Sequence, residues 1–352
     1  MISLSEEMTD KNRLLVLTWM VGCGALVFCM VILGGTVRLT GSGLSMVEWN
    51  LLMGVIPPLG QSGWLKVFGQ YQQFPEYLLI NSSMTLSEFK FIYLMEYAHR
   101  ILGRLIGIAF ILPFVFFVAT KRITTSLLPR LCCLMLLGAL QGGIGWYMVK
   151  SGLVDDPHVS QYRLTLHFMI AALIYGYMFR VITGLLPDLT MPDSPILKYS
   201  GMGVLIIILL MMTTGGFVAG TKAGFIFNTF PLMGNKWIPS QMFDLLPYWK
   251  NLTENPVTIQ FVHRWLAILV LLIVCLYGIA LIRLKALRFV TYLGAVIILA
   301  GCFQVLLGIS TLVARVPVHL GVIHQGGAFI LLTLITISVS AFFPKLYTKP
   351  LI

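Results

Sequence analysis

The stretch Phe261-Val-His-Arg-Trp-Leu-Ala-Ile-Leu-Val-Leu-Leu-Ile-Val-Cys-Leu-Tyr-Gly-Ile-Ala-Leu-Ile282 is apolar except for His263 and Arg264 near its start. An apolar run of about 20 residues crosses a bilayer as a helix, which satisfies its own backbone hydrogen bonds. The sequence therefore predicts an all-α polytopic membrane protein with eight transmembrane helices. The predicted spans are residues 14–36, 97–118, 129–149, 164–186, 199–220, 261–282, 289–312 and 320–343.

Composition and charge support this class. Hydrophobic residues make up 58% of the 352 and charged residues 11%, which excludes an ordinary soluble domain. The net charge of +11 reflects membrane topology and lipid contact, so we expect no nucleic-acid partner. The short connections on the outer side of the membrane hold few basic residues, mainly Lys150, Arg163 and Arg315. Most basic residues flank the connections on the other side, so that side and both termini are predicted to be cytoplasmic. The basic residues that flank the other connections are Lys11, Arg13, Lys121, Arg122, Arg130, Arg180, Lys198, Arg283, Lys285, Arg288, Lys345 and Lys349.

All six cysteines lie inside apolar stretches, without the spacing of a disulfide framework or a zinc site. We expect small buried apolar side chains at these positions. The sequence indicates no chemistry for the adjacent Cys132 and Cys133. The other four are Cys23, Cys29, Cys275 and Cys302.

Two long connections, residues 37–96 and 221–260, lie on the outer side in this topology and are rich in aromatic residues, Gly and Pro. This composition favours interfacial caps over disordered linkers. Thr85-x-x-Glu88 predicts a capping box, and Asn255-Pro256 predicts a helix start.

The two halves of the chain repeat the same motifs at nearly constant offsets. The sequence thus predicts two tandem four-helix bundles, residues 1–190 and 191–352, related by a pseudo-twofold axis along the membrane normal. The matched motifs are Tyr97-Ala-His-Arg100 with Phe261-Val-His-Arg264, Gln141-x-x-x-Gly145 with Gln304-x-x-x-Gly308, and Gly34-Gly35 with Gly215-Gly216, the glycine pairs ending the first and fifth helices.

The second, fourth, sixth and eighth predicted spans each have a histidine near their start, and these four histidines share one depth in the membrane. Each has a small residue four positions later on the same helical face, which leaves room for a flat macrocycle. Two imidazoles on neighbouring helices can ligate one haem iron from opposite faces, whereas the alternative role is that of hydrogen-bonded polar residues. The predicted pairs are His99 with His167 and His263 with His324; His158 and His319 are predicted to be solvated loop residues.

Arg100 and Arg264 directly follow two of these histidines, and Arg38 and Arg104 lie near the same outer level. Guanidinium groups suit the propionates of a haem, so Arg100 and Arg264 are candidate propionate contacts. The alternative is that these side chains reach the membrane surface.

The halves differ at one position next to a candidate ligand. Glu96 lies three residues before His99, and Gln260 lies three residues before His263. A carboxylate carries protons or stabilises positive charge, whereas an amide only forms hydrogen bonds. This difference predicts one reactive haem site and one electron-holding site. The alternative for Glu96 is an ion pair with Arg100 or Arg38.

Long strings in this chain resemble haem A synthase in its cysteine-free mitochondrial and proteobacterial form. Residues 37–96 contain no Cys, unlike members with a cysteine pair in this connection. The similar strings are Gly34-Gly-Thr-Val-Arg-Leu-Thr-Gly-Ser-Gly-Leu-Ser-Met-Val-Glu-Trp49, Glu88-Phe-Lys-Phe-Ile-Tyr-Leu-Met-Glu-Tyr-Ala-His-Arg100, Asn228-Thr-Phe-Pro-Leu-Met233 and His324-Gln-Gly-Gly-Ala328.

The resemblance implies an enzyme that oxidises the C8 methyl group of haem O to the formyl group of haem A by two hydroxylations and loss of water. It implies that His263 and His324 ligate a haem b cofactor, that His99 and His167 receive haem O, and that Glu96 is catalytic. It also implies haem O synthase as a partner and the bacterial inner membrane, or the mitochondrial inner membrane in a eukaryote, as the location.

The sequence names neither the electron acceptor nor the oxygen source. It also leaves open the oligomeric state, including a homo-oligomer, and whether both haem sites are filled together. The leading alternative is a non-catalytic di-haem cytochrome b, and the second is a transporter, which the repeat and the many glycines also fit.

Overall fold

The computed structural model describes residues 7–48, 56–150, 152–153, 157–187, 189, 191, 194–284, 288–343 and 346. Eight helices in these ranges are long and apolar enough to cross a membrane, which confirms the predicted spans. They are α1 (Asp10–Leu39), α4 (Leu86–Ala119), α5 (Leu128–Lys150), α6 (Gln161–Leu185), α7 (Pro195–Gly220), α8 (Pro256–Leu284), α9 (Arg288–Val313) and α10 (Val318–Ser340). Trp49, Lys285, Lys345 and Lys349 lie outside the described residues.

The starts of α4 and α8 are fixed by the predicted caps. The Thr85 hydroxyl accepts a hydrogen bond from the Glu88 N–H at 3.3 Å, and the Glu88 carboxylate accepts one from the Thr85 N–H at 2.8 Å. The Asn255 side-chain oxygen accepts a hydrogen bond from the Val257 N–H at 2.9 Å. The first N–H groups of a helix have no partner within the helix, and these caps accept hydrogen bonds from them. For this reason α4 and α8 begin before their apolar segments.

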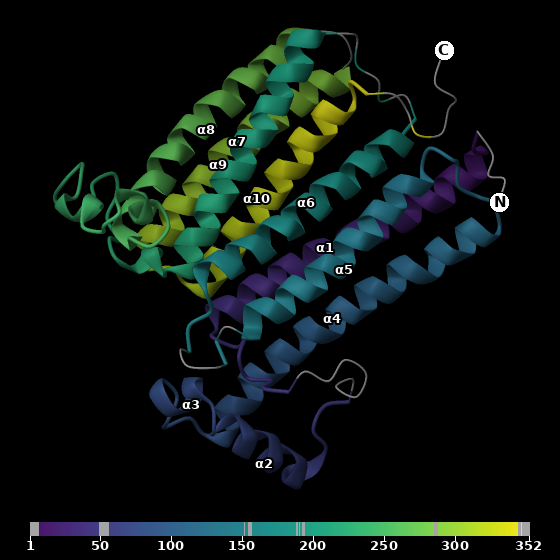
Figure 1. Ribbon diagram of the computed structural model, residues 1–352. Helices are drawn as coiled ribbons and strands as arrows, with labels where there is room; N and C mark the ends of the chain where they lie inside the picture. Colours follow the sequence, from purple (N-terminus) through teal and green to yellow (C-terminus); the bar gives the residue numbers. More distant parts are fainter. Residues whose placement is uncertain are drawn as a thin grey trace.

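The spans form two rings of four helices (Figure 1). In the first ring α1 packs on α4 and α6, and α5 packs on α4 and α6; in the second ring α7 packs on α8 and α10, and α9 packs on α8 and α10. The rings meet where α6 contacts α10, flanked by contacts of α1 with α10 and of α6 with α7. Exchanging the two halves leaves this pattern unchanged, which favours the predicted repeat.

The glycine pairs do not end their helices as predicted. Gly34 and Gly35 lie inside α1, which continues to Leu39, and Gly215 and Gly216 lie inside α7. Both pairs face other helices, so they serve close packing rather than helix termination. The Gly216 Cα, for example, lies so near Thr165 of α6 that an added Cβ would come within 2.9 Å of that side chain.

One apolar core runs through both rings. Its centre lies between α6 and α10, the most buried of the eight spans. The Phe329 ring of α10 packs on Tyr175 and Phe168 of α6, with ring centroids 5.3 and 5.7 Å apart. Since α6 and α10 occupy equivalent places in their rings, this contact joins the halves rigidly at the centre.

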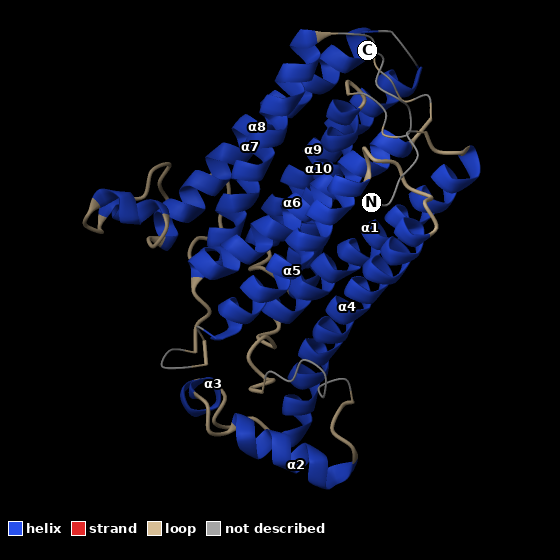
Figure 2. Ribbon diagram, turned by 45° about the vertical axis from the view of Figure 1, so that its right-hand side comes forward, coloured by secondary structure: helices blue, strands red, loops and turns tan. Residues whose placement is uncertain are grey.

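The two outer connections fold into short helices at one end of the rings (Figure 2). The first contains α2 (Gly60–Tyr71) and α3 (Pro75–Leu79), and the second contains three 3₁₀ turns, η2 (Ala223–Phe225), η3 (Ser240–Phe243) and η4 (Tyr248–Leu252). No strand occurs among the described residues. The prediction of ordered caps is therefore confirmed for the described parts of both connections.

The cysteines are less buried than predicted. Cys23 alone is fully buried, Cys29 and Cys133 are exposed, and the others are half-buried. An exposed thiol on a membrane helix faces lipid, which is as apolar as a protein core. The expected apolar surroundings are thus supplied by the bilayer for these side chains.

Candidate haem sites

The four candidate ligands lie on helices that face each other across a ring. His99 on α4 opposes His167 on α6, and His263 on α8 opposes His324 on α10. The two members of each predicted pair are close enough to interact electrostatically. The expectation of neighbouring helices was wrong, because α4 and α6 are separated by α1 on one side and α5 on the other.

Each imidazole packs against a glycine of an adjacent helix. A Cβ atom added to any of these glycines would lie 2.9–3.3 Å from the nearest imidazole atom, closer than ordinary contact. The repeat identified these glycines by their spacing, but sequence alone did not connect them with the histidines. The pairs are Gly34 with His99, Gly145 with His167, Gly215 with His263, and Gly308 with His324.

Two glutamines hold the backbone beside the ligands on α6 and α10. The Gln141 side-chain amide donates a hydrogen bond to the His167 carbonyl at 3.1 Å, and that of Gln304 donates one to the His324 carbonyl at 2.8 Å. The Oε1 atoms of both glutamines and the Nδ1 atom of His167 are buried without a hydrogen-bond partner. Buried polar atoms of this kind indicate a group that completes the site.

These features fit haem. Each ring contains two imidazoles on opposite helices, and each imidazole lies against a glycine of an adjacent helix. No group of three or more metal-binding side chains occurs among the described residues. Two axial ligands suffice for a haem iron, because the porphyrin supplies four nitrogens.

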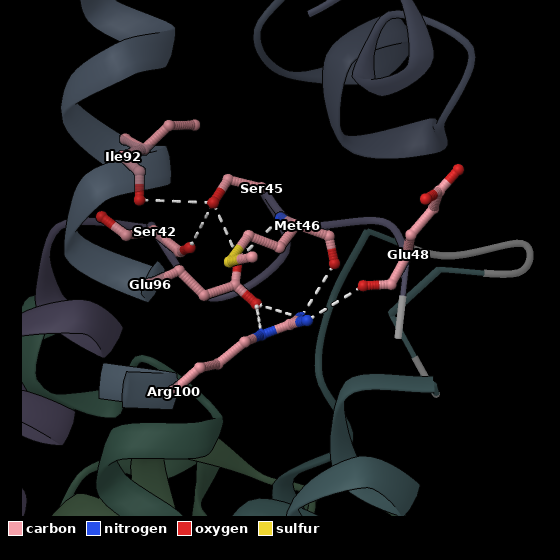
Figure 3. A network of polar contacts seen from close by, with 7 residues as sticks. All are labelled: Ser42, Ser45, Met46, Glu48, Ile92, Glu96 and Arg100. Atoms are coloured by element: carbon pink, nitrogen blue, oxygen red, sulfur yellow. Dashed lines mark hydrogen bonds and ion pairs between the residues drawn. The ribbon is translucent and has the colours of Figure 1, made fainter. Parts of the chain in front are cut away.

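Glu96 lies beside the first site and is 3% exposed (Figure 3). Its Oε2 atom accepts hydrogen bonds from the Ser45 hydroxyl at 2.7 Å and the Met46 N–H at 2.8 Å. Its Oε1 atom pairs with the Arg100 guanidinium at 2.5 Å. The structure thus contains the ion pair with Arg100 that the sequence left open as an alternative.

The Arg100 side chain also binds main-chain oxygens of the first outer connection. Its terminal nitrogens donate hydrogen bonds to the carbonyl of Met46 at 2.8 Å and the carbonyl of Glu48 at 3.0 Å. Several of its donors are therefore engaged by the protein itself. This reduces what Arg100 offers to a haem propionate.

The second half repeats this arrangement with one change. Arg264 donates hydrogen bonds to the carbonyls of Phe227 and Thr229, both at 2.7 Å, and the Gln260 amide donates one to Phe227 at 3.0 Å. Phe227 and Thr229 occupy the places of Met46 and Glu48. Among the described residues Arg264 has no carboxylate partner, and its Nε atom is buried without a hydrogen bond. The second site therefore retains an uncompensated cation.

The remaining candidates do not share one level: Arg38 lies near the outer end of α1, whereas Arg104 lies in the middle of α4, so the prediction of the same outer level was wrong for Arg104. Arg38 lies one turn beyond Gly34 on α1, and Arg104 lies one turn beyond Arg100 on α4. His158 is exposed in a bend, as predicted. His319 is exposed but lies in the first turn of α10, so the prediction of a loop residue was wrong in its secondary structure. Pro317 starts that helix earlier than the hydropathy indicated.

Glu76 of α3 is a further buried carboxyl that sequence reasoning missed. Burial raises its pKa to about 7, and the negative charge of Glu96 acts in the same direction. A hydrogen bond from the Tyr71 hydroxyl at 3.0 Å and the charge of Lys222 oppose this shift. A single Glu in an aromatic outer connection gave no sequence signal of such burial.

The raised pKa predicts how stability depends on pH. Between pH 4.5 and about 7 the folded protein binds more protons at Glu76 than the unfolded chain, so stability falls as pH rises through this window. The loss amounts to at most about 3 kcal/mol. We expect Glu76→Gln to remove this part of the pH dependence and to raise the melting temperature at pH 8. The prediction would be contradicted if the melting temperatures of the two proteins changed with pH in the same way from pH 4.5 to 8.

Comparison with known proteins gives the family of this chain. The sequence model of the family described as cytochrome oxidase assembly protein matches residues 17–336. Haem A synthase of Nitrosospira multiformis is 44% identical over 90% of this chain and 90% of its own length. The chain belongs to the haem A synthase family. The haem A synthases of Parvibaculum lavamentivorans and Wolbachia pipientis are 43% and 42% identical, over 92% and 89% of this chain and 93% of each relative.

Family membership and fold cover the same residues. The match to the haem A synthase family begins in α1 and ends in α10, so it includes all four histidines, Glu96 and both outer connections. Haem is thus the group expected in the two rings, in line with the histidine pairs and the glycines that pack against them.

Proposed function

We propose that this chain is a haem A synthase that oxidises the C8 methyl group of haem O to a formyl group by successive hydroxylations. The observation that carries the proposal is that two histidine pairs lie in surroundings of different charge within one repeated framework. One site has the Glu96–Arg100 pair, and the other has Gln260 and an unpaired Arg264 cation. The names of the relatives support the same activity.

The second bundle, residues 191–352, holds haem b as a cofactor between His263 and His324. A bound haem b supplies a place to store and pass electrons. The free Nε of Arg264 is available to a propionate, and the buried cation needs such a carboxylate to offset its charge. Gly215 and Gly308 lie against the two imidazoles, His263 Nδ1 contacts the Thr214 hydroxyl at 2.8 Å, and His324 Nδ1 contacts the Gln304 amide at 3.3 Å.

The first bundle, residues 1–190, receives haem O between His99 and His167. Glu96 lies one helical turn from His99 and is assigned the catalytic role. Both of its oxygens already accept hydrogen bonds, which favours stabilisation of positive charge near the reacting methyl group over proton carriage. Arg100 positions this carboxylate, and its contact with a propionate is secondary.

The protein lies in the bacterial inner membrane, or in the mitochondrial inner membrane of a eukaryote, with both termini cytoplasmic. Basic residues at the ends of α4, α7 and α8 support this orientation. Haem O synthase supplies the substrate, because haem O is too apolar to diffuse through water.

Co-expression with haem O synthase in a host without haem A tests the function. We expect extraction and chromatography of the bound haems to give haem A, a hydroxylated intermediate and haem b. Haem b with unchanged haem O would indicate a di-haem cytochrome b. A purified protein without Soret absorbance would indicate a transporter.

A further inference from the structure

The two rings differ most at the contact between their second and third helices. In the second ring α8 and α9 pack closely, because Gly278 and Gly294 face each other; a Cβ on Gly278 would lie 2.8 Å from the Gly294 carbonyl oxygen. The repeat places Phe114 on α4 and Leu131 on α5 at these positions. Two large side chains replace two glycines, and α4 contacts α5 over a much shorter length than α8 contacts α9.

The space between α4 and α5 continues toward the histidines. A Cβ added to Gly107 of α4, or to Gly138 or Gly142 of α5, would meet no atom within 4 Å. Gly138 and Gly142 are exposed and Gly107 is half-buried, so these three glycines mark the poorly packed boundary between α4 and α5, which we call the α4–α5 slot. It lies one to two turns from His99 and borders Gln141, between Gly138 and Gly142.

The second ring closes the equivalent space. Leu271 and Val305 stand where the first ring has Gly107 and Gly142. The third position, Gly301, is buried under Leu271 and Val274, whose side chains lie 3.4 and 3.1 Å from an added Cβ. The same fold thus has an open wall at one haem site and a filled wall at the other.

A cavity of about 200 Å³ lies at the outer end of the slot. Its lining combines Arg100 of α4 with Lys150 and Trp146 of α5, and the Lys150 ammonium lies 5.3 Å from the Trp146 ring centre. The position of Lys150 is occupied by Val313 in the second half. A lysine cation therefore stands at this end in the first half only, since the charge of Arg100 is paired with Glu96.

Polar atoms inside the first ring indicate what the slot leads to. His167 Nδ1 and Gln141 Oε1 are buried without hydrogen-bond partners. Gln141 lies on α5 next to Gly142, and its side-chain nitrogen lies 3.3 Å from the His167 ring. The Lys150 cation and the apolar slot together match a flat apolar molecule with carboxylates at one edge, and the imidazole of His167 suits an iron at its centre.

We propose that the α4–α5 slot is the port through which haem O passes sideways from the bilayer to His99 and His167, and through which haem A returns. This inference rests on the proposed function. The ring and its polyprenyl chain stay in apolar surroundings throughout, while the propionates move along the outer level past Lys150. Leu271 and Val305 block the same movement in the second ring, which keeps haem b in place.

The double variant Gly107→Leu, Gly142→Val tests the port by installing the residues of the second ring. The matched control is Gly22→Val, Gly203→Leu, since these glycines of α1 and α7 also meet no atom within 4 Å. The full-length protein with haem b is placed in nanodiscs and mixed with vesicles that contain haem O. Soret changes report uptake, and transfer to haem-free vesicles reports release.

We expect uptake and release of haem O to slow together by at least about tenfold in the slot variant. Its equilibrium affinity and haem b spectrum stay as in the control. Lys150→Gln, which leaves the helix packing intact, is expected to slow uptake as well. This second variant keeps the test valid if the slot variant fails to fold.

Unchanged rates in both variants would overturn the port. A weaker equilibrium affinity with an unchanged uptake rate would also overturn it, because the glycines would then line the binding site instead of the route. A wild-type protein that takes up no haem O would contradict the proposed function itself, which separates the two failures.

Discussion

Replacement of His263 or His324 by alanine is expected to abolish the low-spin spectrum of haem b. Each imidazole is one of two axial ligands, and the side chains that contact them, Thr214 at His263 and Gln304 at His324, are poor ligands for a haem iron. The loss of either ligand therefore changes the spin state or releases the haem. Absorbance spectra and pyridine haemochrome analysis of the purified variants measure this.

Two controls sharpen this prediction. His319→Ala changes an exposed residue on the same helix as His324 and should leave the haem b spectrum unchanged. His99→Ala should retain haem b but lose haem O, because it alters only the first ring. A normal haem b spectrum in either His263→Ala or His324→Ala would refute the ligand assignment.

Glu96→Gln is expected to lower haem A formation at least about 100-fold, the usual size of effect when a preorganised charged group is removed. The amide keeps the shape of the side chain but lacks the negative charge beside the substrate. The change reproduces the Gln260 and Arg264 combination, which the second half already accommodates. The haem content of cells that supply haem O measures the effect.

The structural part of the Glu96 effect can be separated from the catalytic part. Breaking a buried ion pair often destabilises a protein by about 3–5 kcal/mol. Haem b occupancy and melting temperature near the wild-type values would show that this cost is small here. The control variant is Glu76→Gln, which removes another buried carboxyl, in the first outer connection, by the same change of side chain. Wild-type haem A formation by Glu96→Gln would remove the catalytic assignment.

The eight spans could be predicted because a bilayer leaves the chain few choices. Apolar runs of sufficient length must be helical, and caps such as Thr85-x-x-Glu88 fix where a helix begins. Hydropathy does not say which helices are adjacent. The ring order, with His99 and His167 on opposite helices, follows from packing, so the expectation of neighbouring helices failed.

The candidate sites were predictable only in part for a similar reason. The histidines and Glu96 carry distinctive chemistry, and the repeat drew attention to them. Gly145 and Gly308 were visible as matched positions, but their contact with the imidazoles depends on how α5 approaches α6 and α9 approaches α10. The slot depends on pairs such as Phe114 and Leu131, which are far apart in sequence and chemically ordinary.

The way in which Arg100 and Arg264 hold the outer connections has a consequence for sequence divergence. Both guanidinium groups bind main-chain oxygens, at Met46 and Glu48 in one half and at Phe227 and Thr229 in the other. A carbonyl group is the same whichever residue carries it. The anchorage therefore does not depend on the side chains at these four positions, and the two connections differ in sequence without losing it.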